Sequence, residues 1–281
     1  MRSASHFRDQ AKWGAAVLRS FPAARQLAEY DGVPVAELED AFGSPLLAFS
    51  ELPSTQDAAH ILGAEGAPSG TVVVAERQSA GRGRQGKQWQ SGTPSGVWVT
   101  RLDRPDGREA LGVLSLRLGL MLAAGLEPFA DSPVMLKWPN DIHLASGKLA
   151  GILVEARWRD ERPEWVAAGV GVNVSRPQGD TSGIAGCLRD LTSRSEVLRV
   201  VVAALAEAVG GGAVLASWEM EAWAARDMAA GARCVAPMEG IVLGISADGA
   251  LRLQDADGVE RTARAGSLQL VNDHSTRENR R

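Results

Sequence analysis

The stretch TVVVAERQSAGRGRQGKQW, residues 71–89, joins a β-branched segment to a loop rich in glycine and arginine. The β-branched run over 71–76 is typical of a strand. The glycines that follow let backbone N–H groups approach an anion closely. Arg82, Arg84 and Lys87 add side chains that bind carboxylate and phosphate oxygens. The loop therefore suits a ligand with several anionic groups, with a solvated basic surface loop as the alternative.

Two common nucleotide-binding motifs match this loop only by accident. A dinucleotide fingerprint of the form G-x-G-x-x-G must open a helix, whereas the composition over 90–96 is that of a loop. A phosphate-binding loop of the form G-x-x-x-x-G-K needs a serine or threonine next, to bind magnesium. Gln88 stands at that position. The sequence therefore disfavours both motifs.

The composition of the 281-residue chain narrows the class of protein. Hydrophobic residues make up 45% and charged residues 23%, which is typical of a globular protein with a full core. Two cysteines cannot form a disulfide framework, and no run approaches the roughly 18 apolar residues of a membrane helix. The start of the chain lacks the apolar run of a signal peptide, so we expect a cytoplasmic protein. The net charge of −4 argues against a surface-wide nucleic-acid footprint.

Outward from the loop, the sequence predicts an α+β protein. Apolar and β-branched runs predict strands at 46–50, 71–76, 96–101, 134–138, 149–157 and 165–174. Helical spacing predicts two or three short helices over 1–45, a helix capped by Ser54, and helices over 110–127, 195–209 and 214–228. Beyond Gly231, Asp-Gly turns predict the hairpins of a small β-barrel. We expect an N-terminal extension over 1–45, a main domain over 46–229, a small domain over 230–272 and a polar tail over 273–281.

A second group of unusual segments lies further along the chain: KWPND (137–141), KLAGILVE (148–155) and GVGVN (169–173). Lys148 opens an apolar strand, where its charge lies beside buried backbone, although a solvated strand-edge lysine is the alternative. Asn140 and Asp141 also allow simple turn chemistry. Two glycines in one strand, Gly169 and Gly171, indicate that a ligand or another backbone comes close.

Taken together, these segments resemble the motifs of the biotin protein ligase family. Four occur in the family's order: STQD (54–57), the segment from Gln78 through GRGR (81–84) to Trp89, KWPND joined to KLAGILVE, and GVGVN. The resemblance spans about residues 46–271. It implies a mixed β-sheet with flanking helices, related to class II aminoacyl-tRNA synthetases and lipoate ligases, and an SH3-like C-terminal domain. It also implies a ligase that forms biotinyl-5′-AMP from biotin and ATP and transfers biotin to a lysine.

The resemblance assigns roles to single residues. Ser54, Thr55 and Gln78 match those that bind the polar head of biotin, whose uncharged ring needs neutral donors and acceptors. Lys148 and Arg82 match the catalytic cations, and Asp141 is a candidate base for the second half-reaction. The full set expected to bind biotin is Ser54, Thr55, Gln56, Gln78, Arg82, Gly83, Arg84, Lys148, Gly151 and Gly169. The full set expected to bind ATP is Arg82, Arg84, Lys87, Trp89, Asn140, Asp141, Lys148 and Asn173.

Magnesium is expected to arrive with ATP and to keep several waters, with Asp141 as the protein ligand to consider. The four histidines are not expected to form a metal cluster. Two departures from the family's pattern bear on affinity. Gln56 stands where asparagine is usual, and Gln85, Lys87 and Gln88 make the loop less arginine-rich than in some relatives. Both departures concern how tightly biotin and the adenylate are held.

Three alternatives stay open. A lipoate or octanoate ligase shares the fold, but it needs a long apolar channel and usually lacks the Gly-Arg-Gly loop. A noncatalytic biotin-binding module would leave the cations without a purpose. A biotin-responsive repressor must bind DNA, yet the first 45 residues carry five basic and six acidic residues. The expected acceptor is the biotin carboxyl carrier domain of acetyl-CoA carboxylase or a related carboxylase, and the sequence allows a monomer or a homodimer.

Overall fold

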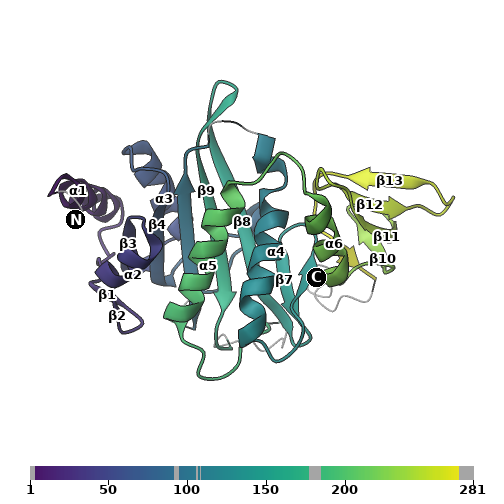
Figure 1. Ribbon diagram of the computed structural model, residues 1–281, viewed down its shortest axis with the longest axis horizontal. Helices are drawn as coiled ribbons and strands as arrows, with labels where there is room; N and C mark the ends of the chain where they lie inside the picture. Colours follow the sequence, from purple (N-terminus) through teal and green to yellow (C-terminus); the bar gives the residue numbers. More distant parts are fainter. Residues whose placement is uncertain (1–3, 92–94, 106, 108, 177–184, 272–281) are drawn as a thin grey trace.

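The computed structural model describes residues 4–91, 95–105, 107, 109–176 and 185–271. Its centre is a seven-stranded mixed sheet (Figure 1). Only β3 and β4 pair in parallel, and every other neighbouring pair is antiparallel. In spatial order the strands are β3 (Leu46–Leu52), β4 (Thr71–Gln78), β5 (Gly96–Asp103), β9 (Arg162–Asn173), β8 (Gly147–Arg159), β7 (Asp141–Leu144) and β6 (Met135–Lys137).

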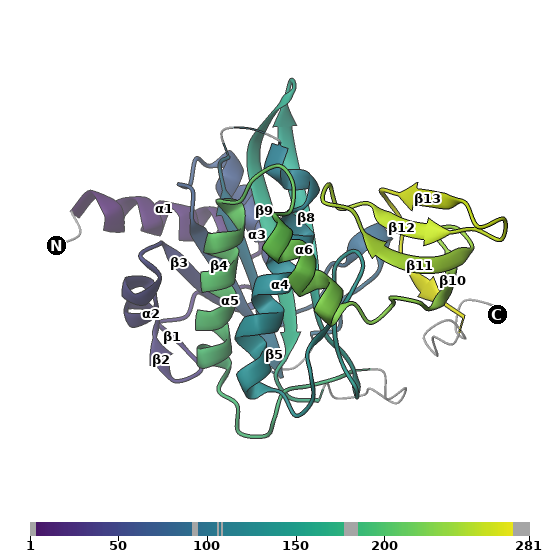
Figure 2. The same cartoon turned by 45° about the vertical axis from the view of Figure 1, so that its right-hand side comes forward.

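Helices cover both faces of this sheet because its strands are apolar on both sides. In β4, Val72 and Val74 belong to the core under α4 (Leu114–Leu126) and α5 (Arg194–Val209). Val73 and Ala75 point to the opposite face, which α3 (Thr55–Ala64) and α1 (Ala4–Ser20) cover. The two layers of helices are seen in Figures 1 and 2. The predicted α+β architecture is therefore confirmed.

The helix ends follow the chemistry expected from the sequence. Ser54 caps α3, and its side chain accepts a hydrogen bond from the backbone N–H of Gln56. Ser193 caps α5 in the same way, and α5 ends at Gly210. The helix expected over 110–127 is shorter, since α4 is flanked by 3₁₀ turns at Glu109–Gly112 and Glu127–Phe129.

The N-terminal segment differs from the expected run of short helices. After the 17-residue α1, the chain forms a hairpin of β1 (Glu29–Tyr30) and β2 (Val33–Pro34), followed by α2 (Val35–Phe42). Asp31 takes a positive φ of 53° at the turn. Its carboxylate accepts hydrogen bonds from Ser193 and Arg194 at the start of α5. The hairpin was missed because these long-range partners, and not local propensity, stabilise it.

The segment KWPND also contains a strand that the sequence did not predict. Asp141, assigned to a possible turn, begins β7, which pairs with β6 on one side and β8 on the other. The four residues of β7 are too few for a clear period in the sequence. As a result, Asn140 and Asp141 lie beside β8, opposite Gly151.

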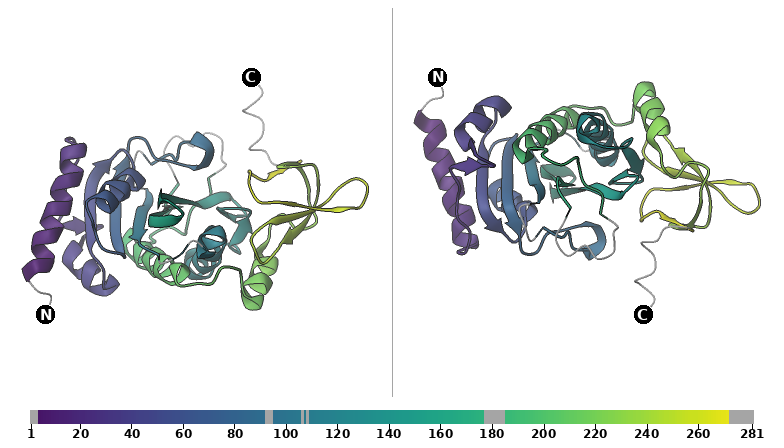
Figure 3. Two further views of the ribbon diagram at one scale, coloured as in Figure 1. Left: turned by 90° about the horizontal axis from the view of Figure 1, so that it is seen from above. Right: turned by 90° about the horizontal axis from the view of Figure 1, so that it is seen from below.

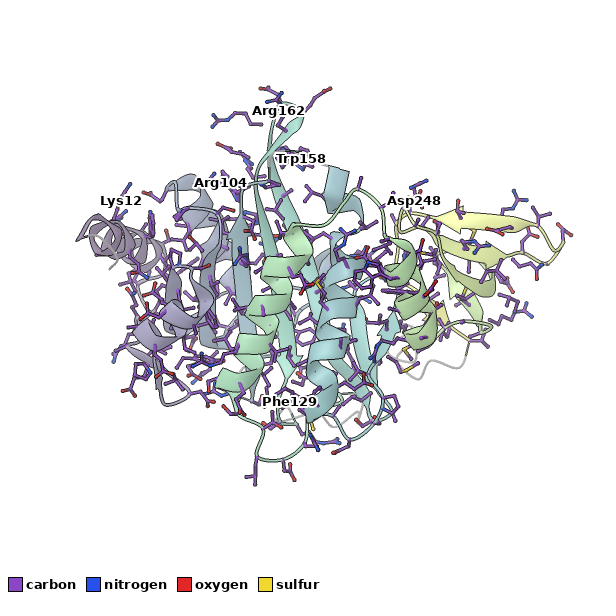
Figure 4. The ribbon with its side chains drawn as sticks, viewed as in Figure 1. Lys12, Arg104, Phe129, Trp158, Arg162 and Asp248 are labelled. Carbon is purple, nitrogen blue, oxygen red and sulfur yellow. The ribbon has the colours of Figure 1, made fainter. Side chains whose placement is uncertain are left out.

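The chain continues through α6 (Ser217–Arg226) into a small antiparallel sheet at the end of the molecule opposite α1 (Figure 3). The turn at Asp248 and Gly249 packs on the main domain (Figure 4), where the Gly249 carbonyl accepts a hydrogen bond from Trp138 Nε1 at 3.0 Å. The domain boundary expected at about 229 stays a prediction. The sheet contains β13 (Glu260–Ala263), β12 (Leu251–Gln254), β11 (Gly240–Ile245), β10 (Arg233–Ala236) and β14 (Gln269–Leu270), in that order.

A buried ion pair joins α4 to α6. Arg117 Nε donates to Glu219 Oε1 at 2.6 Å, and both side chains are less than 5% exposed. The same guanidinium donates to the carbonyls of Gly212 and Val214. Burial raises the pKa of Glu219, but hydrogen bonds from Arg117 and from the Ala216 N–H outweigh it and hold the pKa below its ordinary value.

Substitution of Glu219 by glutamine is therefore expected to lower the free energy of unfolding by about 3 kcal/mol at pH 7, because it leaves Arg117 charged and buried. The folded-state pKa is lowered, so the stabilisation is fully present above the ordinary value of 4.5 and is lost as the pH falls through the lowered one. Urea unfolding at pH 7 and in acid measures both effects. Glu221→Gln, on the exposed side of the same helix, is the control. Equal stability of Glu219→Gln and wild type at pH 7 would contradict this account.

Candidate active site

A cavity of about 170 Å³ opens on the α3 side of the sheet, where α3, the glycine-rich loop and the centres of β5, β8 and β9 meet. The structure brings nearly all the residues expected to bind biotin or ATP to its walls, and Asn173 is the exception. The predicted residues that line the cavity are Ser54, Thr55, Gln56, Gln78, Arg82, Gly83, Arg84, Lys87, Trp89, Asn140, Asp141, Lys148, Gly151 and Gly169.

The floor of the cavity is a chain of buried, uncharged hydrogen-bonding groups. Gln78 Oε1 accepts from the backbone N–H of Thr55 at 2.8 Å, and Gln78 Nε2 donates to Ser91 Oγ at 3.2 Å. The hydroxyls of Thr55 and Thr100 lie 2.9 Å apart, and Thr100 donates to Gln56 Oε1 at 3.1 Å. Because every member is buried and partnered, the floor is rigid and neutral.

Thr100 is a floor residue that sequence reasoning missed. It is fully buried in the middle of β5, where its hydroxyl connects Thr55 to Gln56. The available signal was a threonine that follows the apolar run Val97–Val99 and precedes Arg101. Threonine is common in strands, so that signal alone does not separate a site residue from a packing residue.

The structure shows what glutamine does at position 56. Its Nε2 donates to the Ala167 carbonyl at 3.0 Å, while its Oε1 accepts from Thr100. A side chain at position 169 would meet Gln56 Oε1, since a Cβ added to Gly169 lies 2.7 Å from that atom. Gln56 therefore fills the space that Gly169 leaves, and it belongs to the wall of the cavity.

Trp89 forms the opposite wall. Its indole lies on the two glycines Gly151 and Gly171, where an added Cβ would come within 2.8 Å and 2.7 Å of the ring. These glycines are directly paired across β8 and β9. Among the described residues, the buried Nε1 of Trp89 has no hydrogen-bond partner. The indole thus packs on the backbone of the sheet, with its Nε1 buried near Gly171.

Lys148 lies at the rim, next to this indole. Its Nζ donates to Asp141 Oδ1 at 2.7 Å and lies 5.2 Å from the centre of the Trp89 ring. Asn173, which was expected to bind ATP, does not line the cavity. It donates from Nδ2 to the carbonyls of Lys148 and Gly186 at 3.1 Å and 3.2 Å, and so fixes the backbone that carries the lysine.

Arg84 is the second rim cation. Its Nη1 donates to Asn140 Oδ1 at 3.1 Å, and Asn140 in turn donates to the Ile152 carbonyl on β8 at 2.8 Å. Burial lowers the pKa of Arg84, and the nearby charge of Asp141 opposes that effect. An arginine remains charged at neutral pH despite such a shift.

The loop is also held at two further points. Arg82 pairs with Asp57 at 2.5 Å and with Glu155. At the tip, Ser267 of the small sheet domain donates to Gln85 Oε1 at 3.2 Å, and Ser267 itself lines the cavity. The motifs gave no role to Asp57, Glu155 or Ser267.

In the part of the chain that the structure describes, no group of three or more histidine, cysteine, aspartate or glutamate side chains is placed to hold a metal ion. None of the helices described is long and apolar enough to cross a membrane.

The middle of the chain matches a known protein family. Residues 48–173 match the model of the biotin/lipoate A/B protein ligase family. The chain is 37% identical over 142 residues to the bifunctional ligase/repressor BirA of Bacillus subtilis, which covers 50% of this chain and 44% of that protein. It is 38% identical over 129 residues to the biotin–[acetyl-CoA-carboxylase] ligase of Mycobacterium tuberculosis, which covers 43% of this chain and 46% of that protein. The match therefore spans less than half the length of either relative.

Solved structures agree with this result. The biotin protein ligase from Aquifex aeolicus in complex with biotin and ATP has a TM-score of 0.67 at 26% identity and covers 80% of this chain and 98% of that chain. The Helicobacter pylori biotin acetyl coenzyme A carboxylase synthetase, with a TM-score of 0.58 at 21% identity over 78% of this chain and 100% of that chain, shares the fold. Residues 48–173 thus match the biotin/lipoate A/B protein ligase family, in agreement with the resemblance of the motifs, and the fold is similar to that of biotin protein ligases.

The buried floor gives a direct test of the site. Thr100→Val keeps the shape of the side chain but leaves Gln56 Oε1 without its donor and Thr55 without its neighbour. Loss of one such hydrogen bond corresponds to about tenfold weaker binding. We expect titration calorimetry to show weaker biotin binding by about that factor. Thr262→Val, on the exposed strand β13, is the matched control, and wild-type affinity in Thr100→Val would remove Thr100 from the biotin site.

Proposed function

We propose that the chain is a biotin–protein ligase, an enzyme that activates biotin with ATP and transfers it to a lysine of an acceptor protein. The observation that supports this most strongly is the division of the cavity into two parts. A neutral floor of hydroxyl and amide groups lies next to a rim of four cations, Arg82, Arg84, Lys87 and Lys148. Biotin and its adenylate combine an uncharged ring with a carboxylate or a phosphate. The ring matches the neutral floor, and the anionic group matches the cationic rim.

In the first step, a carboxylate oxygen of biotin attacks the α-phosphorus of ATP. The bond from that phosphorus to pyrophosphate breaks, and biotinyl-5′-AMP forms. Both reactants are anions, so fixed positive charge at their meeting point lowers the barrier. Lys148 on β8 and Arg82 and Arg84 on the loop supply this charge. Asp141 orients Lys148, and Asn140 orients Arg84, before a ligand arrives.

The floor explains why the ring end of biotin is preferred. A ureido group carries two N–H donors and a carbonyl acceptor, and neutral groups can satisfy all of them. Thr55, Gln78 and Thr100 present such groups at the base of the cavity. A lipoyl chain offers these groups no matching donors and acceptors, and so it gains none of those hydrogen bonds. The floor therefore favours biotin over the lipoate alternative.

In the second step, an acceptor lysine attacks the carbonyl carbon of the mixed anhydride. A C–N bond forms, the C–O bond to phosphate breaks, and AMP leaves. The amine must first lose a proton, since a lysine is mostly protonated at neutral pH. Asp141 lies at the rim, paired with Lys148, and is our candidate for accepting it. The acceptor proposed is a biotin carboxyl carrier domain, and the two unpaired cysteines fit a reducing cytoplasm.

Magnesium fits this site as an ion that accompanies ATP. Asp141 and Asn140 are the oxygen-bearing side chains at the rim, and each already bonds to a cation of the site. A site with one or two protein oxygens is typical of magnesium that keeps its waters and binds phosphates. When bound, the ion would neutralise phosphate charge next to Asp141.

DNA binding is not part of the proposal. α1 uses Trp13 and Val17 to pack on Phe49 and Leu62 of the main domain, and so belongs to its second core. The segment over 1–45 also carries no excess of basic residues.

The function is tested by exchange of labelled pyrophosphate into ATP. We expect exchange that depends on biotin and that lipoate does not support. Lys148→Ala should lower the exchange rate by about 10²- to 10³-fold, the loss typical of removing one preorganised charge from a transition state. Its melting temperature should stay close to that of the wild type, because the side chain is partly exposed at the rim.

The matched control is Lys12→Ala, an exposed lysine on α1 at the far end of the molecule (Figure 4). Its exchange rate should equal that of the wild type. Exchange with lipoate but not with biotin would overturn the assignment. Undiminished exchange in Lys148→Ala would remove this lysine from the mechanism.

A further inference from the structure

Two carboxylates outside the assigned site hold the guanidinium of Arg82. Arg82 Nη1 donates to Asp57 Oδ1 at 2.5 Å, from the first turn of α3, and Nη2 donates to Glu155 on β8. One side chain of the loop is thus fastened to a helix and to a strand at the same time. A guanidinium with two carboxylate partners has far fewer accessible orientations than a solvated one.

Glu155 is itself held by a histidine. His60 Nε2 lies 3.0 Å from Glu155 Oε2, on the oxygen that Arg82 does not use. Trp165 Nε1 donates to His60 Nδ1 at 3.0 Å. Since Nδ1 accepts this hydrogen bond, the ring proton resides on Nε2 and is directed at Glu155. The hydrogen bond from His60 holds the pKa of Glu155 below its usual range, against burial and with help from Arg82.

The far end of this chain of contacts is anchored in the core. Trp165 is buried, and its ring lies on Gly63 of α3, where an added Cβ would come within 2.6 Å. Arg104, which is labelled in Figure 4, lies 5.8 Å from the centre of the same ring. These contacts fix the orientation of the indole. Its hydrogen bond orients His60, His60 orients Glu155, and Glu155 in turn holds Arg82.

We propose that Asp57, His60 and Glu155 are positioning residues that hold Arg82 at the cavity before any substrate binds. In this state the glycine-rich loop is already ordered, because Arg84 and Gln85 are fastened as well, to Asn140 and Ser267. The cost of ordering the loop is then met in the free enzyme and not on binding. Since Arg82 acts on the anions of the proposed reaction, the inference rests on the proposed function.

If the loop is ordered before substrate binds, loss of the contacts of Glu155 or His60 should change KM more than kcat. Without Glu155 or His60, only a fraction of the free enzyme has an ordered loop that can bind substrate. KM then rises by the inverse of that fraction. Saturating substrate still orders the loop through the phosphates. The value of kcat should therefore change much less than KM, whereas a residue that only maintains the fold would change both.

The decisive experiment is limited digestion with trypsin in the absence of ligands, with cleavage sites mapped by mass spectrometry. Trypsin cleaves after Arg82, Arg84 and Lys87 only when the loop opens. We expect slow cleavage there in the wild type and about fivefold faster cleavage in Glu155→Gln and in His60→Leu, which corresponds to loss of one charge-assisted contact at a partly exposed site. His60→Gln, which keeps a donor near the position of Nε2, should restore most of the protection.

Glu164→Gln is the matched control. Glu164 lies on the neighbouring strand β9, pairs with Arg159, and is 28% exposed against 25% for Glu155. Its loop should be cleaved at the wild-type rate. Wild-type cleavage in both Glu155→Gln and His60→Leu would overturn the inference, as would a wild-type loop cleaved as fast as those of the variants. Faster cleavage throughout the chain would show a folding role instead and would also overturn it.

Pyrophosphate exchange provides the second readout. Glu155→Gln is expected to raise KM for ATP about fivefold, with kcat within about twofold of the wild type. Equal losses in kcat and KM would contradict a positioning role. If the wild type shows no exchange with biotin, the proposed function fails, but the digestion still decides whether these residues order the loop.

Discussion

The site depends on the direct pairing of Gly151 with Gly171 across β8 and β9. Two glycines side by side leave a flat patch of backbone at the centre of the sheet, and the indole of Trp89 lies on it. A methyl group at either position would occupy the space of the ring. This register also sets Lys148, three residues before Gly151, beside the same ring. Because register in an antiparallel pair is fixed by the alternation of inward and outward residues, the place of Lys148 at the rim follows from it.

The glycine-rich loop completes what the strands begin. It carries Arg82 and Arg84 across the open side of the cavity, and each guanidinium meets a partner from a different element. The neutral floor and the charged rim are thus contributed by separate parts of the fold, α3 with β5 for the first and the loop with β7 and β8 for the second. This separation lets one cavity bind an uncharged ring and stabilise a developing phosphate charge.

Much of this arrangement could be predicted from the sequence, because local chemistry carries it. A serine before a helix predicts a cap, glycines in a strand predict a close approach, and arginines in a glycine-rich loop predict an anion site. Each of these predictions needs only the neighbouring residues. Thr100, His60 and Glu155 could not be found in this way, since each matters through partners far along the chain. Asn173 was expected to bind nucleotide; it does not line the cavity, and its amide donates to the backbone of Lys148.

The most direct test of the account is a crystal structure with a non-reactive analogue of biotinyl-5′-AMP. The account predicts that the phosphate oxygens lie within hydrogen-bonding distance of Arg84 and Lys148, with the ureido ring on Thr55, Gln78 and Thr100. Trp89 should remain on its two glycines. A phosphate bound elsewhere, with Arg84 and Lys148 still turned only to Asn140 and Asp141, would contradict the central claim.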